Sequence, residues 1–251
     1  MLKLLPPSTR MTPTGFDTKW QAVDTEASFR KNCKTQPNDW KYRTQDVTYS
    51  VNSNGYRCAE FNSIDWSNSV VVLGCSLTFG IGVDDSETTS SLLQNILGHN
   101  VINLGMPGTG ADYILHNLAR LKQTNINPKK IIIQYPHSTR SFRWMTPNHV
   151  EAVSIGNDKK DFEQWFLKHD VHHKEHTKSC RDIIRLFYPD VFEYSSHSYV
   201  ANMLSVTDWD THVLAHEMGY TNMTDRARDL IHPGLAVNQA IAELLAKHID
   251  L

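Results

Sequence analysis

The chain has 251 residues, of which 40% are hydrophobic and 21% charged, and its formal net charge is −2. These values are typical of a globular protein long enough to bury one sizeable core. A nearly neutral chain lacks the strong basic excess that marks most nucleic-acid-binding proteins. Because no apolar run reaches the roughly 18 residues of a membrane span, we expect neither nucleic acid nor a membrane as a partner. The sequence leaves the oligomeric state open.

The N-terminus reads M-L-K-L-L-P-P, a short apolar stretch that two prolines end. It is too short for the hydrophobic region of a secretory signal peptide. We therefore expect a cytoplasmic protein, or one that associates with a virion by a route without such a signal. The four cysteines show no C-x-x-C spacing, so in that compartment they are expected to be reduced thiols.

We expect residues 1–66 to form an N-terminal extension that packs on a main domain of residues 67–251. The beginning of the extension is polar and weakly periodic, and a few aromatic side chains would anchor it to the domain. These are Phe16, Trp20, Phe29 and Trp40. Arg57, near the end of the extension, could contact an acidic or sugar ligand, but a structural ion pair is the interpretation we favour.

Runs of β-branched and apolar residues predict strands that are buried on both faces, as in a parallel sheet. The predicted strands cover residues 70–73, 100–104 and 130–135. Helical patterns separate and follow them, at 86–97, 111–122 and after Gly234. Strands that alternate with helices in this way predict an α/β protein with a mostly parallel central sheet.

The hydroxyl of Ser76 lies on the glycine-rich turn after the first predicted strand. Open α/β sheets place their chemistry at the carboxyl ends of the strands. A serine at this position can present its hydroxyl while nearby backbone N–H groups bind an anion. The adjacent Cys75 points elsewhere on such a turn and is expected to be a small packing residue.

Between residues 141 and 211 the pattern loosens, and we expect an insertion that forms a cap or rim over the active-site end of the sheet. Helices are predicted within it at 160–168 and 177–187. Rim aromatic residues could stack on sugar rings, although core packing is the more common role for each. The candidates are Tyr135, Trp144 and Trp209.

Four histidines gather in this segment, at His169, His172, His173 and His176. On a helix they would share one face. No acidic or cysteine residue completes a familiar ligand pattern, so we expect a solvated helix face and no metal.

The C-terminal region contains D-L-I-H-P-G at 229–234. Asp229 and His232 are three residues apart, close enough for one turn to bring the carboxylate against the imidazole. With Ser76 they satisfy the logic of a nucleophile, a base and a group that orients the base. Asp225 is a nearby alternative carboxylate whose spacing to His232 fits less well.

Three blocks resemble those of the SGNH (GDSL-type) hydrolases in order and spacing. They are G-C-S-L-T-F-G at 74–80, N-L-G-M-P-G-T-G at 103–110 and D-L-I-H-P-G at 229–234. The resemblance covers about the last three quarters of the chain. It implies a three-layer α/β/α fold of the flavodoxin-like type, with a mostly parallel central sheet.

The resemblance also implies roles for individual residues. Ser76, His232 and Asp229 would form the catalytic triad, and the backbone N–H groups of Ser76 and Gly105 would bind the oxyanion. The asparagine that the family carries after the third strand has no counterpart at that place in this sequence. The residues that could supply this third donor are Gln134, His137, Ser138 and Arg140.

The function implied is an acyl-ester hydrolase that works through an acyl-enzyme and needs no metal or organic cofactor. A carbohydrate O-deacetylase or a short-chain esterase fits best, with a small-molecule or glycan ester as substrate. One alternative is a glycan-binding module with little or no activity on a hydrolase fold. The other is an O-acyltransferase, which shares the acyl-enzyme.

Overall fold

A computed structural model describes residues 2–8, 11, 17–146, 149–154, 160–209, 214, 216–218 and 225–249. Within these ranges the side chains of residues 143, 145–146, 149, 152–154 and 160–170 are not described. The statements below concern these parts of the chain.

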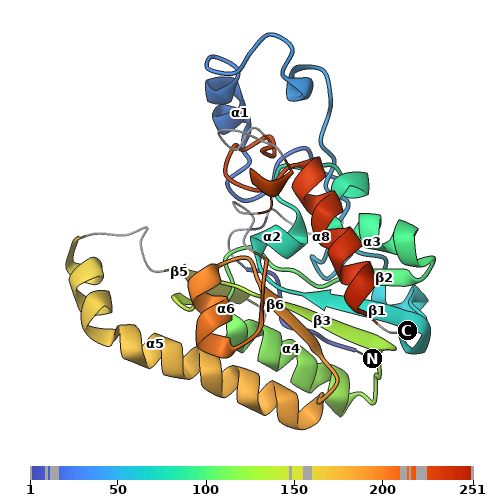
Figure 1. Ribbon diagram of the computed structural model, residues 1–251, viewed down its shortest axis with the longest axis vertical. Coiled ribbons are helices and arrows are strands. Elements are labelled where there is room, and N and C mark those ends of the chain that lie inside the picture. The colour runs from blue at the N-terminus through green and yellow to red at the C-terminus, as the bar shows by residue number, and fades with distance from the viewer. Residues whose placement is uncertain are drawn as a thin grey trace.

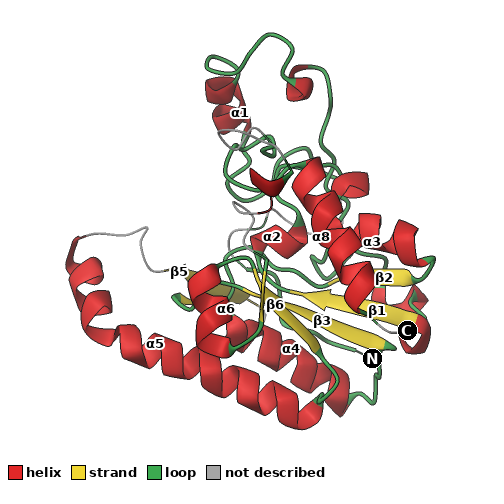
Figure 2. Cartoon of the chain, in the orientation of Figure 1, coloured by secondary structure: helices red, strands yellow, loops and turns green. Residues whose placement is uncertain are grey.

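The core of the protein is a parallel five-stranded sheet with the strand order β2-β1-β3-β6-β7 (Figure 2). The strands are β1 (Ser69–Leu73), β2 (Asn100–Asn103), β3 (Lys130–Tyr135), β6 (Phe192–Ser195) and β7 (Thr207–Asp208). In register, Val71 lies between Ile102 and Ile131. Every residue of β1 is buried, which agrees with its continuous run of apolar β-branched side chains.

Helices cover both faces of the sheet (Figure 1). One face packs on α3 (Thr89–Leu97) and α8 (Leu235–His248), through residues such as Val72, Leu93 and Ile241. The other packs on α4 (Ala111–Gln123) and α5 (Lys160–Phe187), through residues such as Val71, Ile114 and Ile184. The three-layer α/β/α fold with a mostly parallel sheet is thus confirmed.

The remaining elements are short. They are the helices α1 (Glu26–Asn32), α2 (Ser76–Phe79) and α6 (Ser198–Leu204), the antiparallel hairpin of β4 (Arg140–Thr146) and β5 (His149–Ser154), and four single 3₁₀ turns at Lys41–Arg43, Phe61–Ser63, Trp66–Asn68 and Asp85–Glu87.

The segment from 141 to 211 differs from the cap that we expected. Its β6 pairs with β3 inside the sheet, and α5 packs on α4. Residues 160–187 also form one helix of 28 residues, where two were predicted. The segment therefore completes the core, because it supplies the inner strand β6, the edge strand β7 and the helix α5 that covers one face of the sheet.

The N-terminal residues pack closely on the sheet and its helices. The backbone N–H of Leu5, a fully buried residue, donates to Asn117 Oδ1 on α4 at 2.8 Å. The hydroxyls of Tyr56 and Tyr113 lie 2.8 Å apart. Phe29 of α1 lies between Trp20 and Trp40, with ring centroids 5.7 and 5.9 Å away. Phe29 and Trp40 also pack against a buried cluster that contains Phe79 and Ile81 of the main domain, whereas Phe16 lies outside the described residues.

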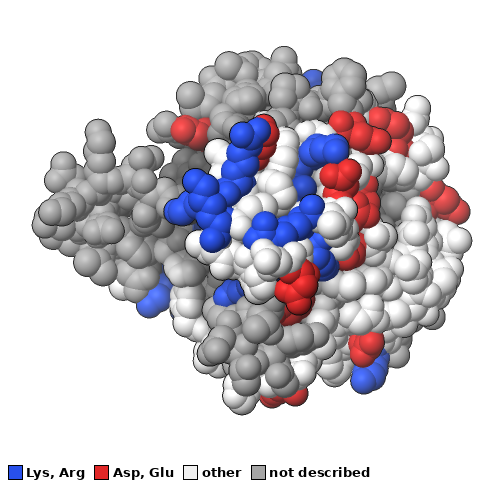
Figure 3. Space-filling view, turned by 90° about the horizontal axis from the view of Figure 1, so that it is seen from above, with Lys and Arg blue, Asp and Glu red and all other residues white. Residues whose placement is uncertain are grey.

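Basic and acidic side chains both occur on the face seen from above, at the end of the molecule where α1 lies (Figure 3). Ion pairs in the described part of the chain include Arg30 with Glu26 and Lys41 with Glu87. None of the helices in the described ranges is long and apolar enough to span a bilayer.

Candidate active site

Ser76 is the first residue of α2, directly after the carboxyl end of β1. Gly74 lies two positions before it, and a side chain at position 74 would collide with Thr78 of α2. The helix ends at Gly80, which adopts the left-handed conformation with φ 82° that glycine reaches without steric cost. This tight strand–helix turn leaves Ser76 only 7% exposed.

The Ser76 hydroxyl reaches the imidazole of His232 across 156 positions of sequence. Its Oγ lies 2.9 Å from His232 Nε2, and His232 Nδ1 lies 2.5 Å from Asp229 Oδ2. All three residues are buried. The structure therefore joins the three predicted side chains in one continuous chain of hydrogen bonds.

The carboxylate of Asp229 is held by its own turn. Its Oδ1 accepts the backbone N–H groups of Ile231 and His232, each at 3.1 Å. Burial alone would raise the pKa of Asp229, but the hydrogen bonds and charge of His232 and the two backbone N–H groups outweigh it and lower the pKa below its usual value. The ionised carboxylate is an acceptor, so His232 Nδ1 carries the proton and Nε2 accepts from Ser76.

The turn between these two residues is strained. Leu230 has φ 62°, a left-handed conformation that is costly for a residue with a side chain. Its N–H donates to the Ala227 carbonyl at 2.9 Å. With Leu230 in this conformation, the backbone between Asp229 and His232 turns tightly enough for the carboxylate to contact the imidazole.

Asp225, the alternative carboxylate, is used elsewhere. Its Oδ2 accepts the backbone N–H of Val237 at 2.8 Å, in the first turn of α8. Burial is the main cause that raises its pKa. Of the two carboxylates, the structure places Asp229 against His232.

The expected role of Gly105 needs a correction. Its N–H already donates to Asn103 Oδ1 at 2.9 Å, so this N–H is not free to donate to an oxyanion. A Cβ at Gly105 would lie 2.5 Å from the Phe79 nitrogen and 2.8 Å from Thr78 Cβ. The glycine is thus explained by the close approach of its loop to α2.

Three of the four candidate third donors make hydrogen bonds within the fold. Gln134 accepts from the Thr78 hydroxyl and donates to Ser196 Oγ, both at 2.6 Å. The Ser138 hydroxyl lies 2.8 Å from that of Tyr199. Nδ1 of His137 lies 2.7 Å from the Thr139 hydroxyl.

Arg140, the fourth candidate, is different. Its Nη1 is buried and makes no hydrogen bond with the described residues. Of the four candidates, only Arg140 therefore has a buried donor known to be unused.

The predicted rim aromatic residues differ in exposure. Tyr135 is fully buried and donates to Glu193 Oε1 at 2.9 Å. Trp209 is buried against Tyr194 and Phe192. Both are core residues, whereas Trp144 is 45% exposed.

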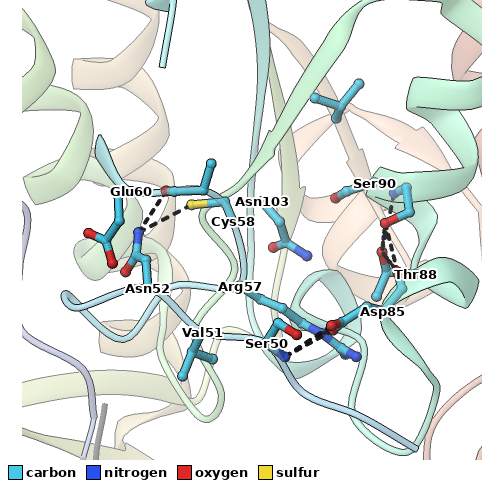
Figure 4. A pocket seen from close by; sticks show the side chains of 13 residues that line it. Ser50, Val51, Asn52, Arg57, Cys58, Glu60, Asp85, Thr88, Ser90 and Asn103 are labelled. Atoms are coloured by element: carbon cyan, nitrogen blue, oxygen red, sulfur yellow. Dashed lines mark hydrogen bonds and ion pairs between the residues drawn. The ribbon is translucent and has the colours of Figure 1, made fainter. Parts of the chain in front are cut away.

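A pocket of about 420 Å³ lies between residues 50–60 and the start of α3 (Figure 4). Neither Ser76 nor His232 lines it. Its one arginine, Arg57, is fully engaged: the guanidinium pairs with Asp85 at 2.6 Å and donates to four backbone carbonyls, those of Thr48, Phe79, Gly80 and Val83. Arg57 is therefore the structural residue that we favoured over a ligand contact.

No cluster of three or more His, Cys, Asp or Glu side chains suited to a metal occurs among the described residues. Of the predicted histidine face, the side chain of His169 lies outside them. His176 lies 3.8 Å from Asp112 and 3.8 Å from Cys180. Cys75 is fully buried, and all four cysteines are free thiols.

Sequence reasoning did not single out Asp24, Tyr49 or Arg228, which form a buried network beside Asp229. Asp24 and Arg228 are 204 positions apart, so no local pattern connects them. The one available signal was the position of Arg228 directly before Asp229 in the sequence.

No protein-family model matches the sequence, and no curated protein sequence matches it. Several solved structures are similar to it. TesA is 16% identical with a TM-score of 0.43, over 70% of this chain and 95% of that one. A lipolytic G-D-S-L family member from Veillonella parvula is 12% identical with a TM-score of 0.44, over 72% and 97%. A family two carbohydrate esterase from Clostridium thermocellum, solved with cellohexaose, is 12% identical with a TM-score of 0.44, over 73% and 64%.

Proposed function

We propose that the protein is a serine ester hydrolase in which Ser76 is the nucleophile, His232 the base and Asp229 the residue that orients the base. The observation that carries this proposal is the unbroken hydrogen-bond chain from the Ser76 hydroxyl through His232 to Asp229. A serine hydroxyl is a weak nucleophile unless a neighbouring base takes its proton, and the base must itself be held in the correct tautomer. Asp229 supplies that constraint.

In the proposed reaction, Ser76 Oγ attacks the ester carbonyl carbon while His232 Nε2 takes the hydroxyl proton. The C–O bond to the leaving alcohol breaks, and His232 returns the proton to the alcohol oxygen. A water molecule then gives a proton to His232 and attacks the acyl carbon. The bond from that carbon to Ser76 Oγ breaks, and His232 returns the proton to Oγ, which releases the acid and the free serine.

The negative charge on the tetrahedral intermediate needs donors already in place. We assign the first to the backbone N–H of Ser76. For the second we assign the N–H of Gly108, because it donates to no acceptor in the described ranges and belongs to the same loop as Gly105. Arg140 is the candidate for the third, since it retains an unused buried nitrogen.

The substrate class that we propose is a short acyl ester of a small alcohol or a sugar. The nucleophile is largely buried, which favours a compact acyl group. Of the aromatic side chains considered for sugar stacking, Trp144 is the one that is exposed. A carbohydrate O-deacetylase and a short-chain esterase both fit this class.

The test is burst kinetics with p-nitrophenyl acetate, with wild type beside Ser76→Ala. We expect a burst equal to the concentration of sites, followed by slower turnover, and the loss of both in the variant. A fluorophosphonate should label wild type on Ser76 and leave the variant unlabelled. Labelling that persists in Ser76→Ala would refute the assignment of the nucleophile.

Two further outcomes separate the alternatives. Turnover that appears only when a sugar hydroxyl is added would identify an O-acyltransferase, because the same acyl-enzyme would then await an acceptor other than water. A folded wild-type protein with neither burst nor labelling would refute the hydrolase and leave the glycan-binding module, which is tested by titration with acetylated and free xylo-oligosaccharides.

A further inference from the structure

The N-terminal segment and the loop that carries Asp229 are joined by a buried ion pair. The guanidinium of Arg228 lies 2.7 Å (Nη2) and 3.1 Å (Nε) from the two carboxylate oxygens of Asp24. Their side chains are 3% and 0% exposed. In Figure 1 the two segments, at opposite ends of the colour range, lie side by side at the upper end of the molecule.

The backbone of Arg228 is held as firmly as its side chain. Its N–H donates to the Gly82 carbonyl at 2.8 Å, and its carbonyl accepts from Asn32 Nδ2 at 3.0 Å. Arg228 is therefore fixed on one side by α1 of the N-terminal segment and on the other by the turn after α2.

Tyr49 closes this arrangement into a ring. Its hydroxyl donates to Asp24 Oδ2 at 2.5 Å and accepts the N–H of Gly82 at 2.7 Å. The path from Asp24 through Tyr49, Gly82 and Arg228 thus returns to Asp24. Burial and the charge of Asp24 raise the pKa of Tyr49, which keeps its hydroxyl protonated.

The guanidinium also lies against two aromatic rings of the N-terminal segment. Its centre is 4.1 Å from the ring centroid of Trp20 and 5.9 Å from that of Phe29. A planar guanidinium stacks well on aromatic faces while its edge donates hydrogen bonds. The side chain of Arg228 therefore contacts the N-terminal segment through Asp24, Trp20 and Phe29.

The ring touches the proposed active site directly. Asp229 follows Arg228 in the chain, and a Cβ placed on Gly82 would lie 3.1 Å from Asp229 Oδ1. Catalytic groups must be held to within about half an ångström of their productive positions by the residues around them. A shift of Arg228 or Gly82 would move the carboxylate that orients His232.

We propose that Asp24 and Tyr49 are positioning residues for the Asp229–His232 pair, acting through Arg228 and Gly82. The proposal rests on the proposed function. It assigns the N-terminal segment a part in completing the active site, beyond covering the sheet.

The chain offers a matched control for loss of a buried ion pair. Glu193 on β6 is also buried and accepts from two arginines, Arg181 and Arg185, and from the hydroxyl of Tyr135. Like Asp24, it is a buried carboxylate that pairs with arginine and accepts from a tyrosine hydroxyl, and its contacts with described residues are with β3 and α5. Glu193→Gln therefore reports the effect of a lost buried charge alone.

The experiment compares wild type, Asp24→Asn, Tyr49→Phe and Glu193→Gln. The first readout is the proton NMR resonance of the short His232 Nδ1–H···Asp229 hydrogen bond, identified by its loss in His232→Gln. The second is kcat and KM for p-nitrophenyl acetate. Tyr49→Phe keeps the ion pair and serves as the milder variant should Asp24→Asn fail to fold.

We expect Asp24→Asn and Tyr49→Phe to shift or broaden the His232 resonance and to lower kcat about 10- to 100-fold with little change in KM. Glu193→Gln should lower the melting temperature while the resonance and kcat stay as in wild type. The proposal is overturned if the Asp24 and Tyr49 variants behave like Glu193→Gln. Should wild type lack turnover, the proposed function fails, and the resonance still decides whether the ring positions Asp229.

Discussion

The Thr78 hydroxyl donates to the side-chain oxygen of Gln134 at 2.6 Å, inside the protein. Thr78 belongs to the short helix that begins with Ser76, and Gln134 belongs to β3. The nitrogen of Gln134 continues the link to Ser196 Oγ, directly after β6. One buried amide thus ties the helix of the proposed nucleophile to two neighbouring strands.

Gln134→Leu should destabilise the protein markedly. The substitution leaves the hydroxyls of Thr78 and Ser196 buried without this partner, and each such loss costs about 1–3 kcal/mol. Urea denaturation should give a free energy of unfolding that is lower by a few kcal/mol. Gln239→Leu is the control, because Gln239 is only half-buried and its side-chain hydrogen bond to Glu243 is exposed to solvent; a change within about 0.5 kcal/mol is expected there. Equal effects in the two variants would contradict a structural role for Gln134.

Asp229→Asn should nearly abolish ester turnover. An amide cannot hold His232 in the tautomer whose Nε2 accepts the Ser76 proton, and the corresponding change in a serine-protease triad lowers kcat on the order of 10,000-fold. Asp225→Asn should leave kcat within about twofold, because Asp225 accepts a backbone N–H in the first turn of α8, whereas Asp229 is the carboxylate bonded to the imidazole. The measurement is kcat for p-nitrophenyl acetate in both variants. A larger loss in Asp225→Asn would reverse the assignment.

Gly82→Ala should reduce both stability and activity. Gly82 has φ 80°, and a Cβ there would lie 2.7 Å from Ala227 Cβ. Gly98→Ala isolates the conformational part of the cost, because Gly98 has φ 65° with nothing within 4 Å of an added Cβ. We expect Gly98→Ala to cost about 1–2 kcal/mol and to spare kcat, whereas Gly82→Ala should cost more and lower kcat. Thermal unfolding and ester kinetics on the two variants make this comparison.

His176 should make stability depend on pH on the alkaline side. The nearby Asp112 carboxylate and the contact with Cys180 raise its pKa from 6.5 to about 10. Because the folded state binds the proton more tightly, this stabilisation is fully present below about pH 6.5 and is lost as the pH rises through about 10. The difference in urea midpoint between wild type and His176→Gln should therefore shrink between about pH 7 and pH 10.

Asp112→Asn provides the check on that result. In this background, where the main partner is gone, His176→Gln should no longer change the pH dependence. The effect should be modest, since His176 is partly exposed. A difference that stays constant across the pH range would show that the Asp112 contact does not favour the charged imidazole.

Local sequence determined the elements whose signal lies within a few residues. The apolar β-branched runs at 70–73, 100–104 and 130–135 form three parallel strands, because such residues fit a strand buried on both faces. Asp229 and His232 can reach each other because only three positions of sequence separate them, and a single turn brings the carboxylate to the imidazole. Both features could be predicted from the local sequence alone.

Tertiary structure decided the features that depend on distant partners. Strand β6 reads F-E-Y-S, and its buried Glu193 is acceptable only because Arg181 and Arg185 of α5 neutralise it. Whether the N–H of Gly105 is free or hydrogen-bonded depends on the orientation of the Asn103 side chain, which accepts from it. The pairing of Asp24 with Arg228 joins opposite ends of the chain. A buried charge or donor is tolerated only where the fold brings a partner within hydrogen-bond distance. The spacing of residues in the sequence does not show which distant residue that partner is.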